Sequence, residues 1–198
     1  SKVTQKIVET VSPEVDSEYL PHAVDSDIFK KIKDGELLDF VNTTRRQILD
    51  SAQGEAVGEN KKIFFWNNRN ARRKQSGTLI WWFKEFLDEV GHDKATLLMH
   101  TDARDPHGQD LPHIIETLGV DKGQVLLSTT KVEPINLAAM YNACDYTINI
   151  SDAEGFGLAT LESLSCGTPI IVNMTGGLQE QVTDGEDWFG WGIQPSSK

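Results

Sequence analysis

The feature that most restricts the fold of this chain is a regular alternation between short apolar runs and longer amphipathic segments. The apolar runs occupy residues 62–66, 95–100, 124–129, 146–150 and 169–173. The amphipathic segments occupy residues 76–90, 110–119, 133–143, 158–166 and 177–182. Short apolar runs are typical of strands that are buried on both faces of a parallel sheet. The pattern therefore predicts an α/β fold, a Rossmann-like doubly wound parallel sheet with helices on both faces.

Local signals place the ends of the predicted helices. The helix at 76–90 is expected to have Ser76 as its N-cap and to end at Gly91. Pro112 falls in the first turn of the next helix, where its missing N–H costs nothing. Residues 183–198 are rich in turn formers, so we expect a turn-rich tail there.

Two further helices are predicted before the alternation starts. Val3, Ile7 and Val11 recur every four residues, which indicates a helix, with a short extended piece after it. Residues 34–52 are amphipathic, and the polar, glycine-containing residues 53–62 indicate a loop. The buried side of the second helix is expected to consist of Leu37, Leu38, Val41, Ile48 and Leu49.

The composition fits a globular protein and argues against several other classes. The 198 residues carry a formal net charge of −11, which disfavours general nucleic-acid binding. No apolar run approaches the roughly 20 residues of a membrane span, and the N-terminus lacks a signal-peptide core. Cys144 and Cys166 indicate small buried residues in a reducing compartment, although two cysteines alone leave a disulfide open. We therefore expect a cytoplasmic protein that is not transmembrane; the full-length protein can still be membrane-peripheral.

Two unusual stretches fall on the same edge of the predicted sheet. A basic cluster, NNRNARRK at residues 67–74, follows the first strand, and the turn at 151–157 follows the fourth. In open α/β sheets, ligands bind outside the carboxyl ends of the strands. The sequence therefore predicts that the cluster and the turn build one binding site, although they are far apart along the chain.

The turn at 151–157 predicts an anion site with hydroxyl acceptors beside it. Gly155 and Gly157 stand where a helix begins, so a ligand can approach its unpaired N–H groups and the positive end of its dipole. Glu154 and Glu162 flank this point, and carboxylates accept hydrogen bonds from ligand hydroxyls. Phosphate flanked by hydroxyls describes a nucleotide sugar. Taken alone, Glu154 also fits an ordinary turn acid, and Glu162 also fits an exposed helix position.

These residues give the chain a resemblance to the nucleotide-sugar-binding half of glycosyltransferases of the two-Rossmann-domain (GT-B) type. It resembles the large retaining family that includes sucrose synthase, glycogen synthase and bacterial mannosyltransferases. The block EGFGLATLESLSCGTPIIV carries Glu154 and Glu162 at the family's spacing, and Arg69 and Lys74 match its basic signature in the first loop. The resemblance runs from about residue 18 to residue 187.

Other signature positions either match the family or depart from it. Gly176, Gly177 and Glu180 match a later GGxxE element, and YLPHAVDSDIFKKI resembles the passage between the two domains. Asn68 stands where a glycine is common, and Ala159 stands where a proline is common. Neither departure removes a ligand, but Asn68 can change the backbone of the loop that would meet phosphate.

The family pattern implies a role for each matching residue. Arg69 and Lys74 would pair with the diphosphate and stabilise it as it leaves, and they would be catalytic together with Glu154. Glu154 would hold hydroxyls of the transferred sugar, and Glu162 would hold those of the ribose. The other donor-binding positions implied are Thr129, Thr130 and Val132 at the base and Gly155, Phe156, Gly157 and Leu158 around the distal phosphate.

The resemblance also implies the reaction and the partners. A hexose would be transferred from a nucleoside-diphosphate sugar with retention, without a metal ion or other cofactor. The acceptor, which is a glycan, a lipid or a small molecule, would bind with the help of an N-terminal domain that this chain lacks. Residues 1–20 would be the tail of that domain, residues 21–60 a linker with a helix, and residues 61–198 the nucleotide-sugar-binding domain. We therefore expect a piece of a longer protein that binds donor weakly and turns it over poorly or not at all.

Some side chains have simpler interpretations. Arg72 and Arg73 remain ambiguous, since charged runs usually face water. Trp81 and Trp82 stand mid-helix among apolar residues, so we expect them to pack within the fold rather than to form a sugar platform. The loop after the second strand holds a cluster of possible metal ligands, namely His100, Asp102, Asp105, His107 and Asp110. Their spacing matches no strong metal motif, and His100 also fits a place lining the cleft.

Two other functions remain open. One is a non-catalytic module that binds a nucleotide or a sugar. The other is a nicotinamide-dependent dehydrogenase, whose layered architecture is similar. The dehydrogenase is disfavoured because the first strand leads into a basic loop rather than into a glycine-rich turn.

Overall fold

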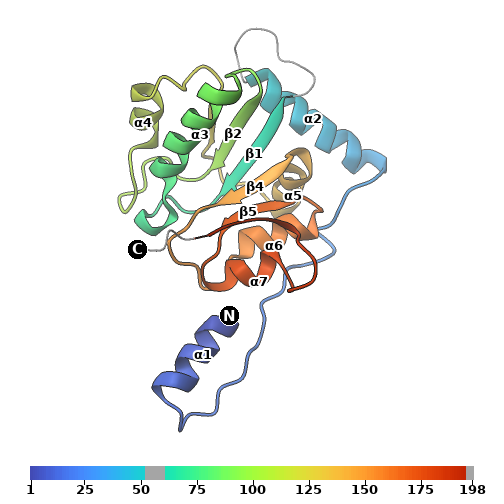
Figure 1. Ribbon diagram of the computed structural model, residues 1–198. Coiled ribbons are helices and arrows are strands. Elements are labelled where there is room, and N and C mark those ends of the chain that lie inside the picture. The colour runs from blue at the N-terminus through green and yellow to red at the C-terminus, as the bar shows by residue number, and fades with distance from the viewer. Residues whose placement is uncertain (52–60, 195–198) are drawn as a thin grey trace.

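Six parallel strands form one sheet in the computed structural model, which describes residues 1–51 and 61–194 (Figure 1). The strands are β1 (Lys62–Asn67), β2 (Ala95–His100), β3 (Val125–Ser128), β4 (Tyr146–Asn149), β5 (Ile170–Asn173) and β6 (Gly190–Ile193). Their order is β3-β2-β1-β4-β5-β6, and every neighbouring pair is parallel. The predicted doubly wound parallel sheet is therefore confirmed. The order reverses between β1 and β4, and ligands bind at such a switch point.

Helices lie on both faces of the sheet, as predicted. α3 (Ser76–Val90) and α4 (Leu111–Thr117) pack on one face. α5 (Pro134–Ala143) and α6 (Leu158–Ser165) pack on the other, with α2 (Gly35–Ser51) against α5. A short 3₁₀ turn, η2 (Gly176–Leu178), leads into α7 (Gln179–Val182), which packs beside β5.

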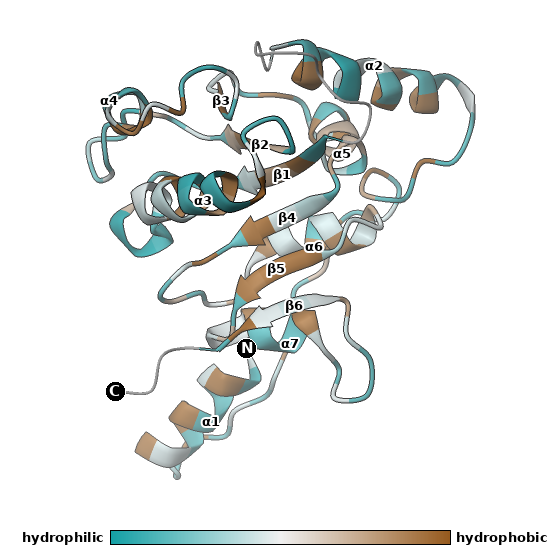
Figure 2. Ribbon diagram, turned by 45° about the horizontal axis from the view of Figure 1, so that its top comes forward, coloured by the Kyte–Doolittle hydropathy of each residue, from teal (hydrophilic) through white to brown (hydrophobic). Residues whose placement is uncertain are grey.

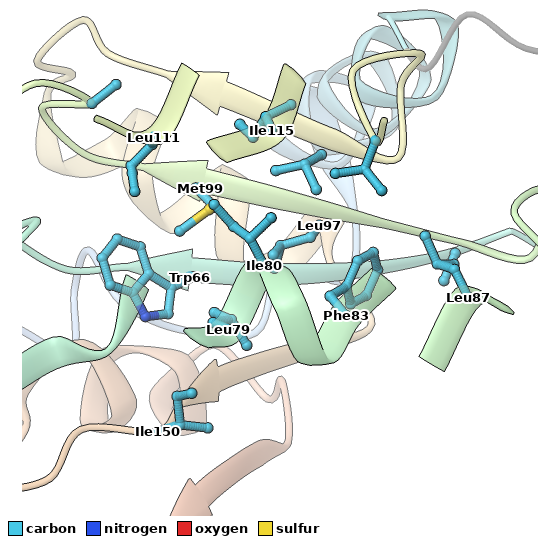
Figure 3. Packing of buried hydrophobic residues seen from close by; sticks show 14 residues of the cluster. Trp66, Leu79, Ile80, Phe83, Leu87, Leu97, Met99, Leu111, Ile115 and Ile150 are labelled. Atoms are coloured by element: carbon cyan, nitrogen blue, oxygen red, sulfur yellow. The ribbon is translucent and has the colours of Figure 1, made fainter. Parts of the chain in front are cut away.

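Successive residues of the central strands pack into two separate apolar cores, one on each face of the sheet. Trp66 of β1 and Met99 of β2 pack with Phe83 of α3 on one face (Figure 3). On the other face, the ring of Phe65 meets the ring of Tyr141 from α5 edge to face, with centroids 5.1 Å apart. Successive side chains of a strand point to opposite faces, so continuous apolar runs are what double burial requires.

The last strand was missed by the sequence prediction. Residues 183–198 read as a turn-rich tail, but Gly190–Ile193 form β6 against β5. A Cβ atom at Gly190 would lie 1.9 Å from the carbonyl oxygen of Ile170. The glycine therefore permits close strand approach and does not mark a turn.

Ser76 does not cap α3 in the way predicted. The helix begins at Ser76 itself, and the capping position is Gln75, in the left-handed conformation with φ 55° and no side-chain cap bond. The Ser76 hydroxyl instead donates to Oδ1 of the fully buried Asn70, at 2.7 Å. Ser76 thus ties the helix to the preceding loop. Gly91 ends the helix as predicted.

The two tryptophans of α3 are largely exposed, so the prediction that they pack within the fold is wrong. Trp81 is 51% exposed and Trp82 is 46% exposed. The buried stripe of α3 is set by residues such as Ile80, Phe83 and Leu87. The face of a helix that packs on a sheet cannot include every residue of an unbroken apolar run. The two indoles lie outside the packed face of α3.

α2 follows its prediction only in part. Val41 and Ile48 are buried, and Leu38 and Leu49 are half-buried. Leu37 is 40% exposed, so its predicted burial is wrong. It stands in the first turn of α2, which projects beyond the rest of the fold (Figure 1).

The N-terminal helix is confirmed as α1 (Lys2–Val11), but none of its residues is buried. It lies apart from the sheet in both views, and its apolar patches remain visible in Figure 2. The predicted loop at 53–62 falls mostly outside the described residues. Among the helices that the structure describes, none is long and apolar enough to cross a membrane.

Candidate active site

The basic loop after β1 and the turn after β4 meet at the carboxyl edge of the sheet. The backbone N–H of Asp152 donates to the carbonyl oxygen of Arg73 at 2.9 Å. Nη1 of Arg73 donates to the carbonyl oxygen of Ala153 at 2.8 Å. The side chain of Gln75 also donates to Asp152. The predicted juxtaposition of the two stretches is therefore confirmed.

A buried ion pair links the two stretches. The ammonium group of Lys74 bonds to the carboxylate of Glu154 and donates to Oδ1 of Asn68 at 2.7 Å. Lys74 is only 7% exposed, and this burial lowers its pKa, whereas the neighbouring Glu154 acts to raise it. Nη1 of Arg73 lies 3.5 Å from Oε2 of Glu154, so Arg73 does not simply face water. Arg72 is exposed.

Gly157 brings the N-terminus of α6 to the same place. Its φ of 93° is left-handed, and a Cβ atom there would lie 2.7 Å from Cδ2 of Leu178. A residue with a side chain would be strained in this position. Gly157 and Leu158 at the start of α6 line one pocket with Lys74, and the first N–H groups of a helix have no partner within it.

The pocket between these groups has a volume of about 350 Å³. It brings together five of the predicted site residues, namely Lys74, Glu154, Phe156, Gly157 and Leu158. The remaining lining residues are His22, Asn68 and Ala159. A cation, a carboxylate and a helix N-terminus therefore share one small cavity, which suits a phosphate group bonded to a polyhydroxylated group.

Sequence reasoning did not assign His22 and Asn68 to the site. His22 packs against Phe156, with ring centroids 4.8 Å apart. It lies within the interdomain segment noted for its resemblance, which was the available signal. Asn68 replaces a common glycine, and its amide oxygen accepts from Lys74. The departure from the family pattern thus supplies a hydrogen-bond partner for the site lysine.

The paired glycines after β5, Gly176 and Gly177, pack against the turn that carries Glu154. A Cβ atom at Gly176 would lie 1.9 Å from the carbonyl oxygen of Glu154, and the N–H of Gly177 donates to that oxygen at 3.1 Å. Glu180 points elsewhere. It accepts from the hydroxyl of Tyr19 at 3.1 Å and from the N–H of Val3 at 3.4 Å. The GGxxE element therefore shapes the site without entering the pocket.

Arg69 is held toward the neighbouring loop. Its Nε and Nη2 atoms donate to the carboxylate of Asp105 at 2.6 and 3.2 Å. This bidentate bond lowers the pKa of Asp105 to about 2. The side chain of Arg69 is 62% exposed and does not line the pocket that the described residues form.

Members of the acidic and histidine cluster after β2 bond to other residues of the protein. Asp105 also accepts from the N–H of His107 at 2.8 Å, and the ring of His100 bonds to the hydroxyl of Ser128 at 2.9 Å. Burial lowers the pKa of His100. In the part of the chain that the structure describes, no three such side chains are placed to hold a metal ion.

Glu162 is half-buried on the side of α6 that faces α5. Its Oε2 atom accepts from the hydroxyl of Tyr141 at 2.8 Å, and its burial raises the pKa of the carboxyl group. Glu162 is therefore neither an exposed helix residue nor part of the pocket around Lys74. In the turn after β3, Thr129 and Thr130 are exposed, and Val132 packs against the core beneath α5.

Comparison with known proteins identifies the class. Residues 50–198 match the family described as Glycosyl transferases group 1, so the chain belongs to this family. The D-inositol 3-phosphate glycosyltransferase of Acidothermus cellulolyticus is 38% identical over 77 residues, which cover 38% of this chain and 17% of that protein. That of Thermomonospora curvata is 48% identical over 50 residues, which cover 25% of this chain and 12% of that protein.

Solved structures share the fold. Sucrose-phosphate synthase from Thermosynechococcus elongatus superposes with a TM-score of 0.72 and 21% identity, covering 98% of this chain and 44% of that one. Anabaena Alr3699/HepE, solved in complex with UDP-glucose, gives a TM-score of 0.65 and 20% identity, covering 87% of this chain and 42% of that one. This chain therefore spans less than half the length of these relatives.

Proposed function

We propose that this chain is the donor-binding half of a retaining glycosyltransferase that uses a nucleoside-diphosphate sugar. The observation that carries the proposal is the single pocket shared by Lys74, Glu154 and the N-terminus of α6 at Gly157. Family membership supports it, as does the UDP-glucose bound by the structurally similar HepE protein.

The ion pair suggests how the site would respond to donor. The ammonium of Lys74 is paired with the carboxylate of Glu154. A diphosphate would compete for that ammonium, because phosphate oxygens are strong acceptors for charged donors. Glu154 would then be free to accept bonds from hydroxyls of the sugar. One contact would thus couple binding of the diphosphate to orientation of the sugar.

Leaving-group stabilisation would follow from the same geometry. Negative charge builds on the diphosphate as the bond to the sugar breaks, and prepositioned cations and N–H groups lower the energy of that state. The lining of the pocket by Lys74, Phe156, Gly157 and Leu158 supports this role for them, and Gly155 would contribute from the same turn. Arg69 would also contact the diphosphate, either while it keeps part of its bond to Asp105 or after that bond breaks. The proposal includes retention at the anomeric carbon and independence from metal ions.

The ribose and base would extend from the pocket toward α5. Glu162 would accept bonds from the ribose hydroxyls, and the turn at Thr129, Thr130 and Val132 would contact the base through its backbone. Residues 1–20 would belong with an N-terminal domain of the whole protein that supplies the acceptor site. We also propose a cytoplasmic location, which the two free buried cysteines, Cys144 and Cys166, favour.

Calorimetry with UDP, GDP and NADH tests the proposal directly. We expect at least one nucleoside diphosphate to bind and the Lys74→Ala variant to lose that binding. The matched control is Lys84→Ala, which removes a half-buried lysine that is paired with Asp88 on α3, away from the pocket. NADH binding without any response to either diphosphate would overturn the proposal.

A further inference from the structure

A hydrogen-bonded chain connects the end of β1 to α6 beneath the site. Nδ2 of Asn67 donates to the hydroxyl oxygen of Tyr141 at 2.9 Å, and that hydroxyl donates to Oε2 of Glu162 at 2.8 Å. The direction is fixed by chemistry. A carboxylate only accepts, so the single phenolic proton points to Glu162, and the phenolic oxygen is left to accept from Asn67.

Tyr141 cannot easily turn away from this position. It has no exposed surface, and its ring meets the rings of Phe65 and Phe29 edge to face, with centroids 5.1 and 6.3 Å apart. Its backbone carbonyl accepts from the hydroxyl of Thr168 at 2.7 Å. The packing of α5 thus presents the phenolic hydroxyl to α6 as a fixed donor.

We infer that Tyr141 is a positioning residue that holds one oxygen of Glu162 so that the carboxylate presents its other oxygen to the donor ribose. This inference rests on the proposed function, in which Glu162 reads the ribose hydroxyls. A free glutamate side chain must be ordered when a ligand binds, and that ordering weakens affinity. The bond from Tyr141 imposes this order in advance. Oε1 and the second lone pair of Oε2 remain available for two neighbouring hydroxyls.

The same bond acts on the charge of Glu162. Burial raises the pKa of this carboxyl group, while the bond from Tyr141 opposes that rise. The thiol of Cys166 also interacts with Glu162, and burial raises the pKa of this thiol to about 12, so it stays neutral. Tyr141 therefore favours the ionised carboxylate, which is the form that accepts bonds from hydroxyls.

The test compares a ribonucleotide with its 2′-deoxy form. Affinities of UDP or GDP, whichever binds more tightly, are measured by calorimetry beside the matching 2′-deoxy diphosphate and inorganic pyrophosphate. The variants are Tyr141→Phe, which keeps the ring and its packing, Glu162→Ala, which removes the acceptor oxygens, and the double variant. The control is Tyr146→Phe, which alters a tyrosine stacked on Phe64 over the opposite face of the sheet.

We expect the unmodified protein to prefer the ribonucleotide and Tyr141→Phe to reduce this preference by roughly three- to tenfold, the size of one hydrogen bond. Pyrophosphate affinity should not change, and neither should any affinity of Tyr146→Phe. Tyr141→Phe should add nothing once Glu162→Ala is present, because Tyr141 acts only through the carboxylate of Glu162. Asn67→Ala should reduce the ribose preference in the same direction, which tests the chain even if Tyr141→Phe does not fold.

The failure of this inference can be told apart from the failure of the proposed function. A protein that binds no nucleoside diphosphate would refute the proposed function, and one that binds it without a ribose preference would refute the assigned role of Glu162. A protein with that preference, kept in full by both Tyr141→Phe and Asn67→Ala, would refute the positioning role of Tyr141 and leave the proposed function standing.

Discussion

Lys74 and Arg69 lie five residues apart on one loop, yet their surroundings differ sharply. Lys74 is 7% exposed, lines the pocket and is paired with Glu154. The side chain of Arg69 is 62% exposed and is paired with Asp105 of the loop after β2. Lys74 is the buried residue of the short helical turn at Arg72–Lys74. Arg69 precedes this turn and bonds to Asp105 in the loop after β2.

The difference teaches that two cations in one sequence signature need not be equivalent. A buried charge such as that of Lys74 is screened little by water, whereas an exposed charge is screened strongly. We therefore expect Lys74 to dominate diphosphate affinity and Arg69 to act as an adjustable second contact.

The largest expected effect is that of Lys74→Ala. Loss of a buried charge-assisted contact should weaken binding of a nucleoside diphosphate by about 100-fold. Calorimetry measures the affinity, and thermal unfolding checks that the variant is folded, because Glu154 would be left without its main partner. An effect no larger than that of Arg69→Ala would abolish the distinction drawn between the two cations.

Glu154→Gln sharpens the comparison from the other side of the ion pair. Removing the carboxylate charge frees Lys74, so a nucleoside diphosphate without a sugar should bind about threefold more tightly. The matching nucleotide sugar should gain nothing or lose affinity, because the amide of the variant keeps only one acceptor oxygen for sugar hydroxyls and carries no charge. The ratio of the two affinities is the measured quantity. If it stays unchanged, Glu154 does not contact the sugar.

Arg69→Ala is expected to have a smaller effect on diphosphate affinity than Lys74→Ala. Its guanidinium is exposed and already paired, so diphosphate affinity should fall by roughly three- to tenfold, less at high salt. Arg104→Ala serves as the control, since Arg104 is also exposed and near an acid, Asp110. Asp105→Asn should release Arg69 and leave affinity equal or slightly higher. A loss with Asp105→Asn as large as with Arg69→Ala would mean that Asp105 must orient Arg69.

The smallest expected effect concerns acid stability. The bond from Arg69 lowers the pKa of Asp105 to about 2 from 3.8, so the folded state favours its ionised form. The stabilisation should be complete above the ordinary value and should fade as the pH drops through about 2. Melting temperatures of the unmodified protein and of Asp105→Asn should therefore converge on acidification. A gap that persists unchanged at the lowest pH would contradict this assignment.

Much of the fold could be predicted because its strands are buried on both faces. The apolar runs at β1 and β2 match the observed strands to within one residue. β6 was missed because Gly190 lies too close to the carbonyl oxygen of Ile170 for any side chain to fit, and this contact is visible only in three dimensions. Trp81 and Trp82 were misjudged because periodicity does not show how wide a stripe the sheet can cover.

The site was predictable where one motif carries its own geometry. Glu154 and Gly157 come from a single turn, and topology alone placed that turn beside Lys74. The partner of Arg69 could not be foreseen, since Asp105 follows a different strand and no spacing rule links the two. Tyr141 was likewise hidden, because a tyrosine in an apolar helix reads as core until its hydroxyl is seen to reach Glu162.

The central claim is that a diphosphate binds between Lys74 and the N-terminus of α6. A crystal structure of the protein bound to UDP or GDP, whichever binds more tightly, tests this claim most directly. We predict a phosphate oxygen within hydrogen-bond distance of both Nζ of Lys74 and an N–H near Gly157, with Glu154 released from the lysine. A nucleotide bound elsewhere, with the pair of Lys74 and Glu154 intact, would contradict the account.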